Sequence, residues 1–160
     1  MNQESGVRDR ESGNTATPIP DYGSALAFDF GAKRIGVALG DLKLKIAHPL
    51  TTIQSEVNEQ RFSAIGELIS EYRPVLLVIG FPVNDDCSEH EMSRLARKFA
   101  QRLAGRFNLR TVLVNEYLSS ASAESALAEA GVHGKRQKLF VDQVAAQQIL
   151  QSFFNDGIVV

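Results

Sequence analysis

The sequence predicts an α/β fold, a mixed five-stranded sheet flanked by helices. Three predicted strands follow one another before the first helix, and helices and strands alternate after it, which is typical of a sheet with antiparallel and parallel neighbours. The run from Val75 to Gly80 is apolar throughout, as expected of a central parallel strand covered on both faces. A chain of 160 residues suits one such domain, or one domain with a tail.

The predicted elements follow in order along the chain. Residues 1–23 lack apolar periodicity and include two prolines, so we expect a disordered N-terminal extension before a folded domain over residues 24–160. Apolar runs and alternation predict strands over Ala25–Gly31, Ile35–Leu39, Ile46–Thr52, Val75–Gly80 and Thr111–Asn115. Helical periodicity predicts helices over Glu56–Tyr72, Ser88–Phe107, Ser120–Ala130 and Leu139–Phe154, the last two separated by a loop with Gly131, Gly134 and a basic cluster. This is the element order of the ribonuclease-H-like fold, although other α/β folds share it.

Composition excludes several classes of protein. A single cysteine, Cys87, excludes an intramolecular disulfide and the cysteine-based zinc sites. The longest apolar run, Val75 to Phe81, is far shorter than the ~20 residues of a membrane span, and the first residues carry no signal-peptide core. We therefore expect a cytoplasmic protein without a membrane partner, as a monomer or weak homodimer. The net charge of −2 means that only a local basic patch could bind nucleic acid.

Asp29 lies inside the first predicted strand, where an unpaired, dry carboxylate is costly. Strand alternation places it on the face opposite Phe28 and Phe30. One explanation is a catalytic role. The other is that Asp29 lies at a frayed strand end or pairs with Lys33 or Arg34.

Two further carboxylates belong to the same predicted edge of the sheet. Glu116 directly follows the fifth strand, at the edge where open α/β sheets bind ligands. Asp142 opens the last predicted helix in line with its apolar stripe, a position that a favourable N-terminal acid does not explain. Three converging carboxylates repel one another unless a cation neutralises them, and oxygen ligands suit Mg²⁺ or Mn²⁺. Such clusters support two-metal hydrolysis of phosphodiester bonds.

Basic residues recur every four positions along the predicted helix 88–107, either as a solvated face or as a surface that follows phosphates. A second group stands in the predicted loop before Asp142, and a third in the link between the first two strands. The predicted nucleic-acid contacts are Lys33, Arg34, Arg94, Lys98, Arg102, Lys135, Arg136 and Lys138.

Four segments closely resemble the YqgF family, small bacterial proteins described both as Holliday junction resolvases and as pre-16S rRNA nucleases. They stand in the family's order and are Ala27–Ala38, Val78–Asn84, Asn115–Ser120 and Val141–Ala146. The resemblance implies a ribonuclease-H-like fold, a divalent-metal nuclease, and an acidic triad formed by Asp29, Glu116 and Asp142. The chain departs from the family at Tyr117, where members usually have an Arg that could hold a phosphate.

The predicted function is Mg²⁺- or Mn²⁺-dependent hydrolysis of phosphodiester bonds in structured nucleic acid. The family resemblance favours processing of the 5′ end of pre-16S rRNA in ribosome biogenesis. Holliday junction resolution in DNA recombination and repair is the same chemistry on branched DNA and stays open. A non-catalytic nucleic-acid-binding module also stays open. The segment 29–33 further resembles the first phosphate motif of sugar kinases and actin-like ATPases, but those enzymes need two such domains around a cleft.

Overall fold

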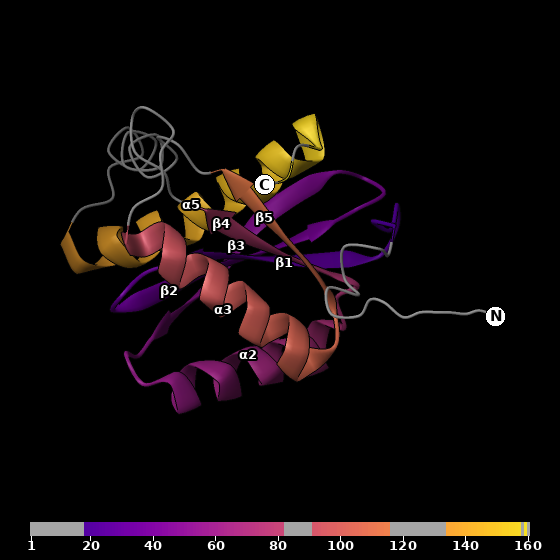
Figure 1. Cartoon of the computed structure of the whole chain (residues 1–160). Helices are drawn as coiled ribbons and strands as arrows, with labels where there is room; N and C mark the ends of the chain where they lie inside the picture. Colours follow the sequence, from indigo (N-terminus) through magenta and orange to yellow (C-terminus); the bar gives the residue numbers. More distant parts are fainter. Residues whose placement is uncertain (1–17, 82–90, 116–133, 158, 160) are drawn as a thin grey trace.

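Within the described residues, five strands form one sheet in the order β3-β2-β1-β4-β5 (Figure 1). The computed structural model describes residues 18–81, 91–115, 134–157 and 159, with the backbone alone for 134–138. The strands are β1 (Ser24–Phe30), β2 (Arg34–Asp41), β3 (Ile46–Gln54), β4 (Leu76–Phe81) and β5 (Arg110–Asn115). β1, β2 and β3 are antiparallel neighbours, whereas β4 pairs in parallel with both β1 and β5. The predicted mixed sheet is confirmed, and β4 lies between β1 and β5.

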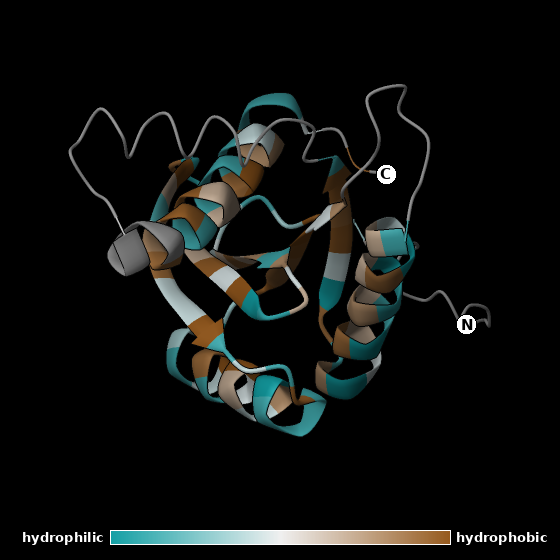
Figure 2. Cartoon of the chain, turned by 90° about the vertical axis from the view of Figure 1, so that its left-hand side faces the viewer, coloured by the Kyte–Doolittle hydropathy of each residue, from teal (hydrophilic) through white to brown (hydrophobic). Residues whose placement is uncertain are grey.

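Helices cover both faces of the sheet (Figure 2). α2 (Asn58–Tyr72) and α3 (Glu91–Phe107) pack on one face, and α5 (Gly134–Asp156) packs on the other. The predicted helix over 120–130 lies outside the described residues. No helix in the described part of the chain is both long and apolar enough to span a membrane.

The two faces of the sheet carry side chains of different size because strand residues alternate. Along β1, Ala25 and Ala27 belong to the core under α5, whereas Leu26 and Phe28 belong to the core under α2 and α3. Phe99 of α3 fills the second core, and its ring centroid lies 6.2 Å from that of Phe28 in an edge-to-face arrangement. The helix on the alanine face can therefore approach the sheet more closely than the helices on the aromatic face.

Helix α5 begins earlier than predicted, at Gly134 and not at Leu139. The expected basic loop was therefore wrong, since Lys135, Arg136 and Lys138 lie in the first turns of the helix. Lys, Arg, Gln and Leu all favour helix, and no helix breaker stands between Gly134 and Asp142. Asp142 lies about two turns into α5. The favourable interaction between an acid and the first turn of a helix therefore does not explain an aspartate at this position.

The folded strand region begins at Ser24, next to the predicted domain boundary. Ile19, which stands in the expected N-terminal extension, packs against the core under α5. Residues 1–17 lie outside the described residues, so the division into an extension and a domain stays a prediction.

Gly36 allows a close contact between α5 and the sheet. A Cβ atom at this position would lie 1.9 Å from the backbone oxygen of Asp142 and 2.9 Å from its Cβ. Gly40, four residues along β2 on the same face, leaves room for the side chains of Leu150 and Phe154. The glycines of β2 therefore allow α5 to pack closely against this strand.

Replacing Gly36 by Ala should lower the free energy of unfolding by about 2–4 kcal/mol, because the new methyl group meets backbone that cannot turn away. Urea denaturation measures this change. Gly105→Ala is the matched control, since a Cβ there meets open space and alanine favours helix. A Gly36→Ala protein as stable as the wild type would show that α5 does not press on β2.

Candidate active site

Asp29 and Asp142 come together across Gly36. Asp29 is paired directly with Gly36 in the β1–β2 register, so the side chains at both positions point to the face that carries α5. Paired Cα atoms of antiparallel strands lie about 5 Å apart. Asp142 sits directly over Gly36, because a Cβ at Gly36 would lie 2.9 Å from that of Asp142. Two carboxylates that are 113 positions apart in the sequence are therefore neighbours at the end of β1.

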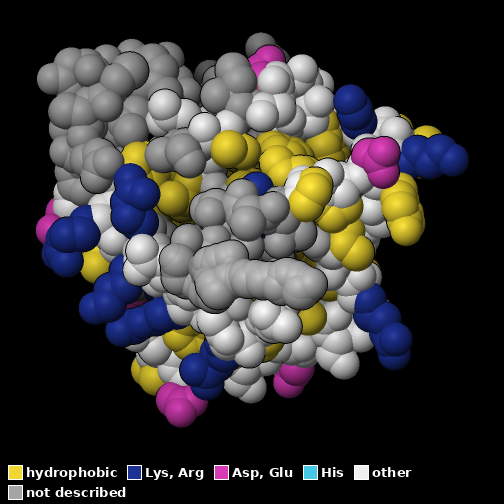
Figure 3. All heavy atoms as spheres, turned by 45° about the vertical axis from the view of Figure 1, so that its right-hand side comes forward, with side chains coloured by type: hydrophobic (Ala, Val, Ile, Leu, Met, Phe, Trp, Pro, Cys, Tyr) yellow, Lys and Arg dark blue, Asp and Glu magenta, His cyan; other side chains and the backbone are white. Residues whose placement is uncertain are grey.

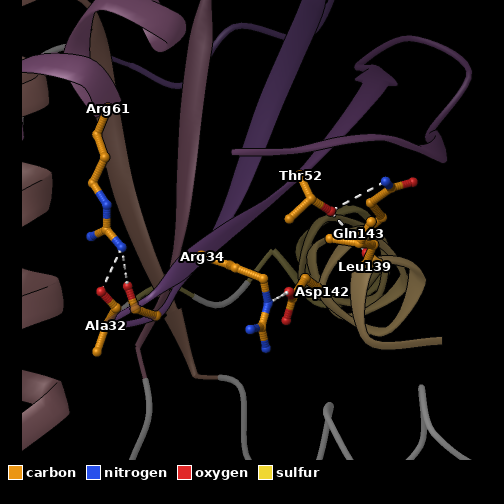
Figure 4. Close-up of polar contacts among 8 residues, drawn as sticks. Ala32, Arg34, Thr52, Arg61, Leu139, Asp142 and Gln143 are labelled. Atoms are coloured by element: carbon orange, nitrogen blue, oxygen red, sulfur yellow. Dashed lines mark hydrogen bonds and ion pairs between the residues drawn. The ribbon is translucent and has the colours of Figure 1, made fainter. Parts of the chain in front are cut away.

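Arg34 pairs with Asp142 and provides a positive charge beside the two carboxylates. Its Nε donates to Oδ2 of Asp142 at 2.6 Å (Figure 4). Side-chain exposures of 34% for Arg34 and 17% for Asp142 leave the pair partly open to water, so its net contribution to stability is small. Arg34 therefore pairs with Asp142, and the interpretation that Asp29 itself pairs with Lys33 or Arg34 stays a prediction. The second oxygen of the Asp142 carboxylate is outside its hydrogen bond with Arg34.

Polar side chains fix the position of α5 against the edge strand β3. Thr52 Oγ1 donates to the backbone oxygen of Leu139 at 2.8 Å, and Gln143 Nε2 donates to Thr52 Oγ1 at 3.2 Å (Figure 4). Further along the helix, Gln147 Nε2 donates to the backbone oxygen of Ala47. These contacts stand directly before and after Asp142, so they hold the turn of α5 that presents this carboxylate.

Arg61 of α2 clamps the loop between β1 and β2 from the opposite face of the sheet. It is 3% exposed, and one guanidinium nitrogen donates to the backbone oxygens of Gly31 and Ala32 at 2.7 and 2.8 Å (Figure 4). Its Nε donates to the backbone oxygen of Ser55. Burial lowers the pKa of the Arg61 guanidinium, and the nearby Glu56 partly opposes this shift.

This clamp was missed in the sequence, where Arg61 resembles any polar helix residue. One signal was available: Arg61 stands four residues before the buried Ile65, and residues at that spacing share a helix face. The hairpin loop that Arg61 holds connects Asp29 to Arg34. Arg61 therefore fixes the local geometry of the carboxylate edge.

The other predicted site residues have different positions. Lys33 is exposed in the β1–β2 loop, and Arg94, Lys98 and Arg102 are exposed on α3, on the face of the sheet opposite Asp29. Glu116 lies outside the described residues, and the side chains of Lys135, Arg136 and Lys138 are not described. Among the residues that the structure describes, no group of three or more Asp, Glu, His or Cys residues could hold a metal ion.

The strand order and the placement of the helices are those of the ribonuclease-H-like class of α/β proteins. In this chain, two carboxylates, Asp29 and Asp142, meet at the end of the first strand. RuvC from Thermus thermophilus, solved in complex with a Holliday junction substrate, has this fold. The similarity gives a TM-score of 0.52 over 84% of this chain and 94% of that chain, at 12% sequence identity. Another structure of the same RuvC gives a TM-score of 0.50.

Sequence comparison identifies the family within this class. The family model RuvX, described as Holliday junction resolvase, matches residues 23–156. A protein of Nitrosospira multiformis named "Putative pre-16S rRNA nuclease" is 55% identical over 85% of this chain and 90% of its own length. Proteins of the same name from Methylobacillus flagellatus and Neisseria meningitidis are 55% and 53% identical. The chain belongs to the RuvX family, for which YqgF is another name, and the resemblance to that family is confirmed.

Replacing Arg61 by Leu should lower the free energy of unfolding by about 2–4 kcal/mol, because three backbone carbonyls lose their buried donor. Arg61→Lys keeps the charge and one donating nitrogen, and should cost less. Arg94→Leu is the control, since Arg94 is exposed and its ion pair with Glu91 should contribute about 0.5 kcal/mol or less. Equal urea midpoints for Arg61→Leu and Arg94→Leu would show that the clamp does not stabilise the hairpin.

Proposed function

We propose that this RuvX-family protein is a divalent-metal-dependent nuclease that cuts structured nucleic acid, with the 5′ end of pre-16S rRNA as its substrate. The observation that carries the proposal is the meeting of Asp29 and Asp142 across Gly36, in a fold of phosphodiester-hydrolysing enzymes. The names of the relatives favour the rRNA precursor over other substrates.

The residues at this edge suit a hard divalent cation. Both described carboxylates offer oxygen ligands only, and one oxygen of Asp142 is outside its bond with Arg34. We propose Asp29, Glu116 and Asp142 as the ligands of Mg²⁺ or Mn²⁺. Two bound metal ions would supply a hydroxide nucleophile at neutral pH and stabilise the leaving oxygen.

The basic residues have separate proposed roles around this edge. Arg34 lies beside Asp142, and once an ion displaces it from that carboxylate its planar guanidinium can hold a phosphate oxygen of the substrate. Lys33 is exposed next to it and reaches outward. We assign substrate contacts near the reaction to these two residues and to Lys135, Arg136 and Lys138. Arg94, Lys98 and Arg102 are assigned contacts with the phosphate backbone further away.

Resolution of Holliday junctions is the second candidate function. The description of the matching family model favours it, and the carboxylate edge would perform the same hydrolysis on branched DNA. The two candidates differ in substrate shape and in the sugar of the cut strand, and share the proposed ligands.

Metal binding should be visible as thermal stabilisation, because an ion that binds only the folded chain raises the melting midpoint. Asp142→Asn should lose most of the rise that the wild type shows in millimolar Mn²⁺. Arg34→Gln should show a larger rise than the wild type, since Arg34 and the ion compete for Asp142. Asp156→Asn, on the exposed end of the same helix, is the control and should respond fully. A full response from Asp142→Asn would remove this residue from the ligand set.

Cleavage should depend on the same carboxylates. Precursor 16S rRNA and a four-way DNA junction, incubated in parallel with Mn²⁺, should separate the two substrates. We expect specific cuts near the rRNA 5′ end, and a loss of at least about 100-fold in rate for Asp29→Asn and Asp142→Asn. Binding without any cleavage of either substrate would favour the non-catalytic module.

A further inference from the structure

An open hollow of about 480 Å³ lies between α2 and α3, on the face of the sheet opposite the carboxylates. It is lined by Asn58, Glu59, Phe62, Arg102, Gly105 and Arg106. A Cβ atom at Gly105 would meet no atom within 4 Å, so α3 leaves this space open at the point where it passes the hollow. The volume falls within the range of small-ligand sites.

The hollow is positively charged and has one apolar wall. The guanidinium of Arg106 lies 4.9 Å from the ring centroid of Phe62, a cation–π contact that holds the charge at the rim. Glu59 is the acid of the hollow and lies 4.0 Å from Arg106, with 86% of its side chain exposed to screening water. Asn58 adds a neutral donor and acceptor. Two guanidinium groups against one exposed carboxylate favour an anion.

A row of basic side chains connects this hollow to the edge of the sheet that carries the carboxylates. Arg94, Lys98, Arg102 and Arg106 follow one another at four-residue steps on α3, which are about 6 Å along the helix axis. Figure 3 shows Lys and Arg side chains gathered on the side of the molecule where α3 lies. Evenly spaced positive charges of this kind suit a nucleic-acid backbone.

The direction of the row follows from the topology. At its start, the Arg97 guanidinium lies 4.8 Å from the ring centroid of Phe81, the last residue of β4, so the first half of α3 is near the carboxyl ends of the parallel strands. At its end, α3 leads into β5, whose first residue Arg110 pairs with the first residue of β4. From Arg94 to Arg106 the row therefore runs about 18 Å along α3, starting near the carboxyl ends of the parallel strands.

We propose that the hollow between α2 and α3 is a second binding site for the phosphate backbone of the substrate nucleic acid, on the face of the sheet opposite the carboxylates. This inference rests on the proposed function and extends it. Substrate held there and at the carboxylate edge must pass from one face of the sheet around its end to the other. A substrate that occupies both sites makes more phosphate contacts than a short strand at either one, so the enzyme prefers long, structured substrates over short ones.

The test places a charge in the hollow without removing any existing group. Gly105→Glu and Gly105→Gln fill the same space and both favour helix over glycine, so the difference between them measures charge alone. Fluorescence anisotropy in EDTA, where no strand is cut, gives the Kd for precursor 16S rRNA, for a four-way DNA junction and for a trinucleotide. Lys43→Glu and Lys43→Gln form the control pair, at an exposed turn between β2 and β3.

We expect Gly105→Glu to bind the long nucleic acids about fivefold more weakly than Gly105→Gln, with a flatter salt dependence. The trinucleotide makes few phosphate contacts and should therefore distinguish the two variants less than the long nucleic acids do. The Lys43 pair should also differ far less. Arg102→Gln should weaken long-substrate binding in the same direction. Suppose that the wild type binds both long substrates, and that Gly105→Glu and Gly105→Gln bind each with equal Kd values. This result would overturn the proposed binding site in the hollow but not the proposed function. A wild type that binds neither substrate would overturn the proposed function as well.

Discussion

The close approach of α5 to β2 at Gly36 is the constraint on which the candidate site depends. Without a side chain at this position, the backbone of Asp142 rests on the sheet directly across from Asp29. Any larger residue would lift the helix and separate the two carboxylates. The same contact brings Asp142 within reach of Arg34, at the start of the strand on which α5 lies. The absence of a Cβ atom at Gly36 thus determines the distance between Asp29 and Asp142 and the position of Asp142 relative to Arg34.

The two faces of the sheet differ in the side chains they present and in the roles proposed for them. Alanine and glycine on the face under α5 allow this helix to approach the sheet closely, so that polar side chains of α5 contact the strands. On the other face, the core under α2 and α3 contains the aromatic rings of Phe28, Phe62 and Phe99. The outer surface of that second layer is then free to carry charge. The proposed chemistry belongs to the first face and the proposed second binding site to the other face.

Local patterns in the sequence predicted the strands and the faces of their residues. The period of two along β1 placed Asp29 opposite Phe28, and the apolar stripe of the last helix placed Asp142 toward the sheet, because both patterns depend only on backbone geometry. The family resemblance was confirmed over residues 23–156, and the roles of Asp29, Glu116 and Asp142 stay a prediction. The start of α5 was predicted five residues late, since its first turns carry no apolar stripe.

Long-range contacts could not be read from the sequence. Asp142, which pairs with Arg34, lies 108 positions away from it, and placing the two together requires the register of β1 and β2 and the distance of α5 from the sheet. Arg61 and the glutamines of α5 look like surface residues until the backbone carbonyls that they bind are placed. The hollow between α2 and α3 depends on the shape of side chains from two helices, which no periodicity describes.

The most direct test of the account is the position of a bound metal ion. Crystals grown with Mn²⁺ and measured near the manganese absorption edge would show the ion by its anomalous scattering. The account predicts a peak at the end of β1, about 2.1 Å from carboxylate oxygens of both Asp29 and Asp142, with Arg34 turned away from the metal. A peak elsewhere, or Asp142 still paired with Arg34 at saturating Mn²⁺ with no ion beside Asp29, would contradict it.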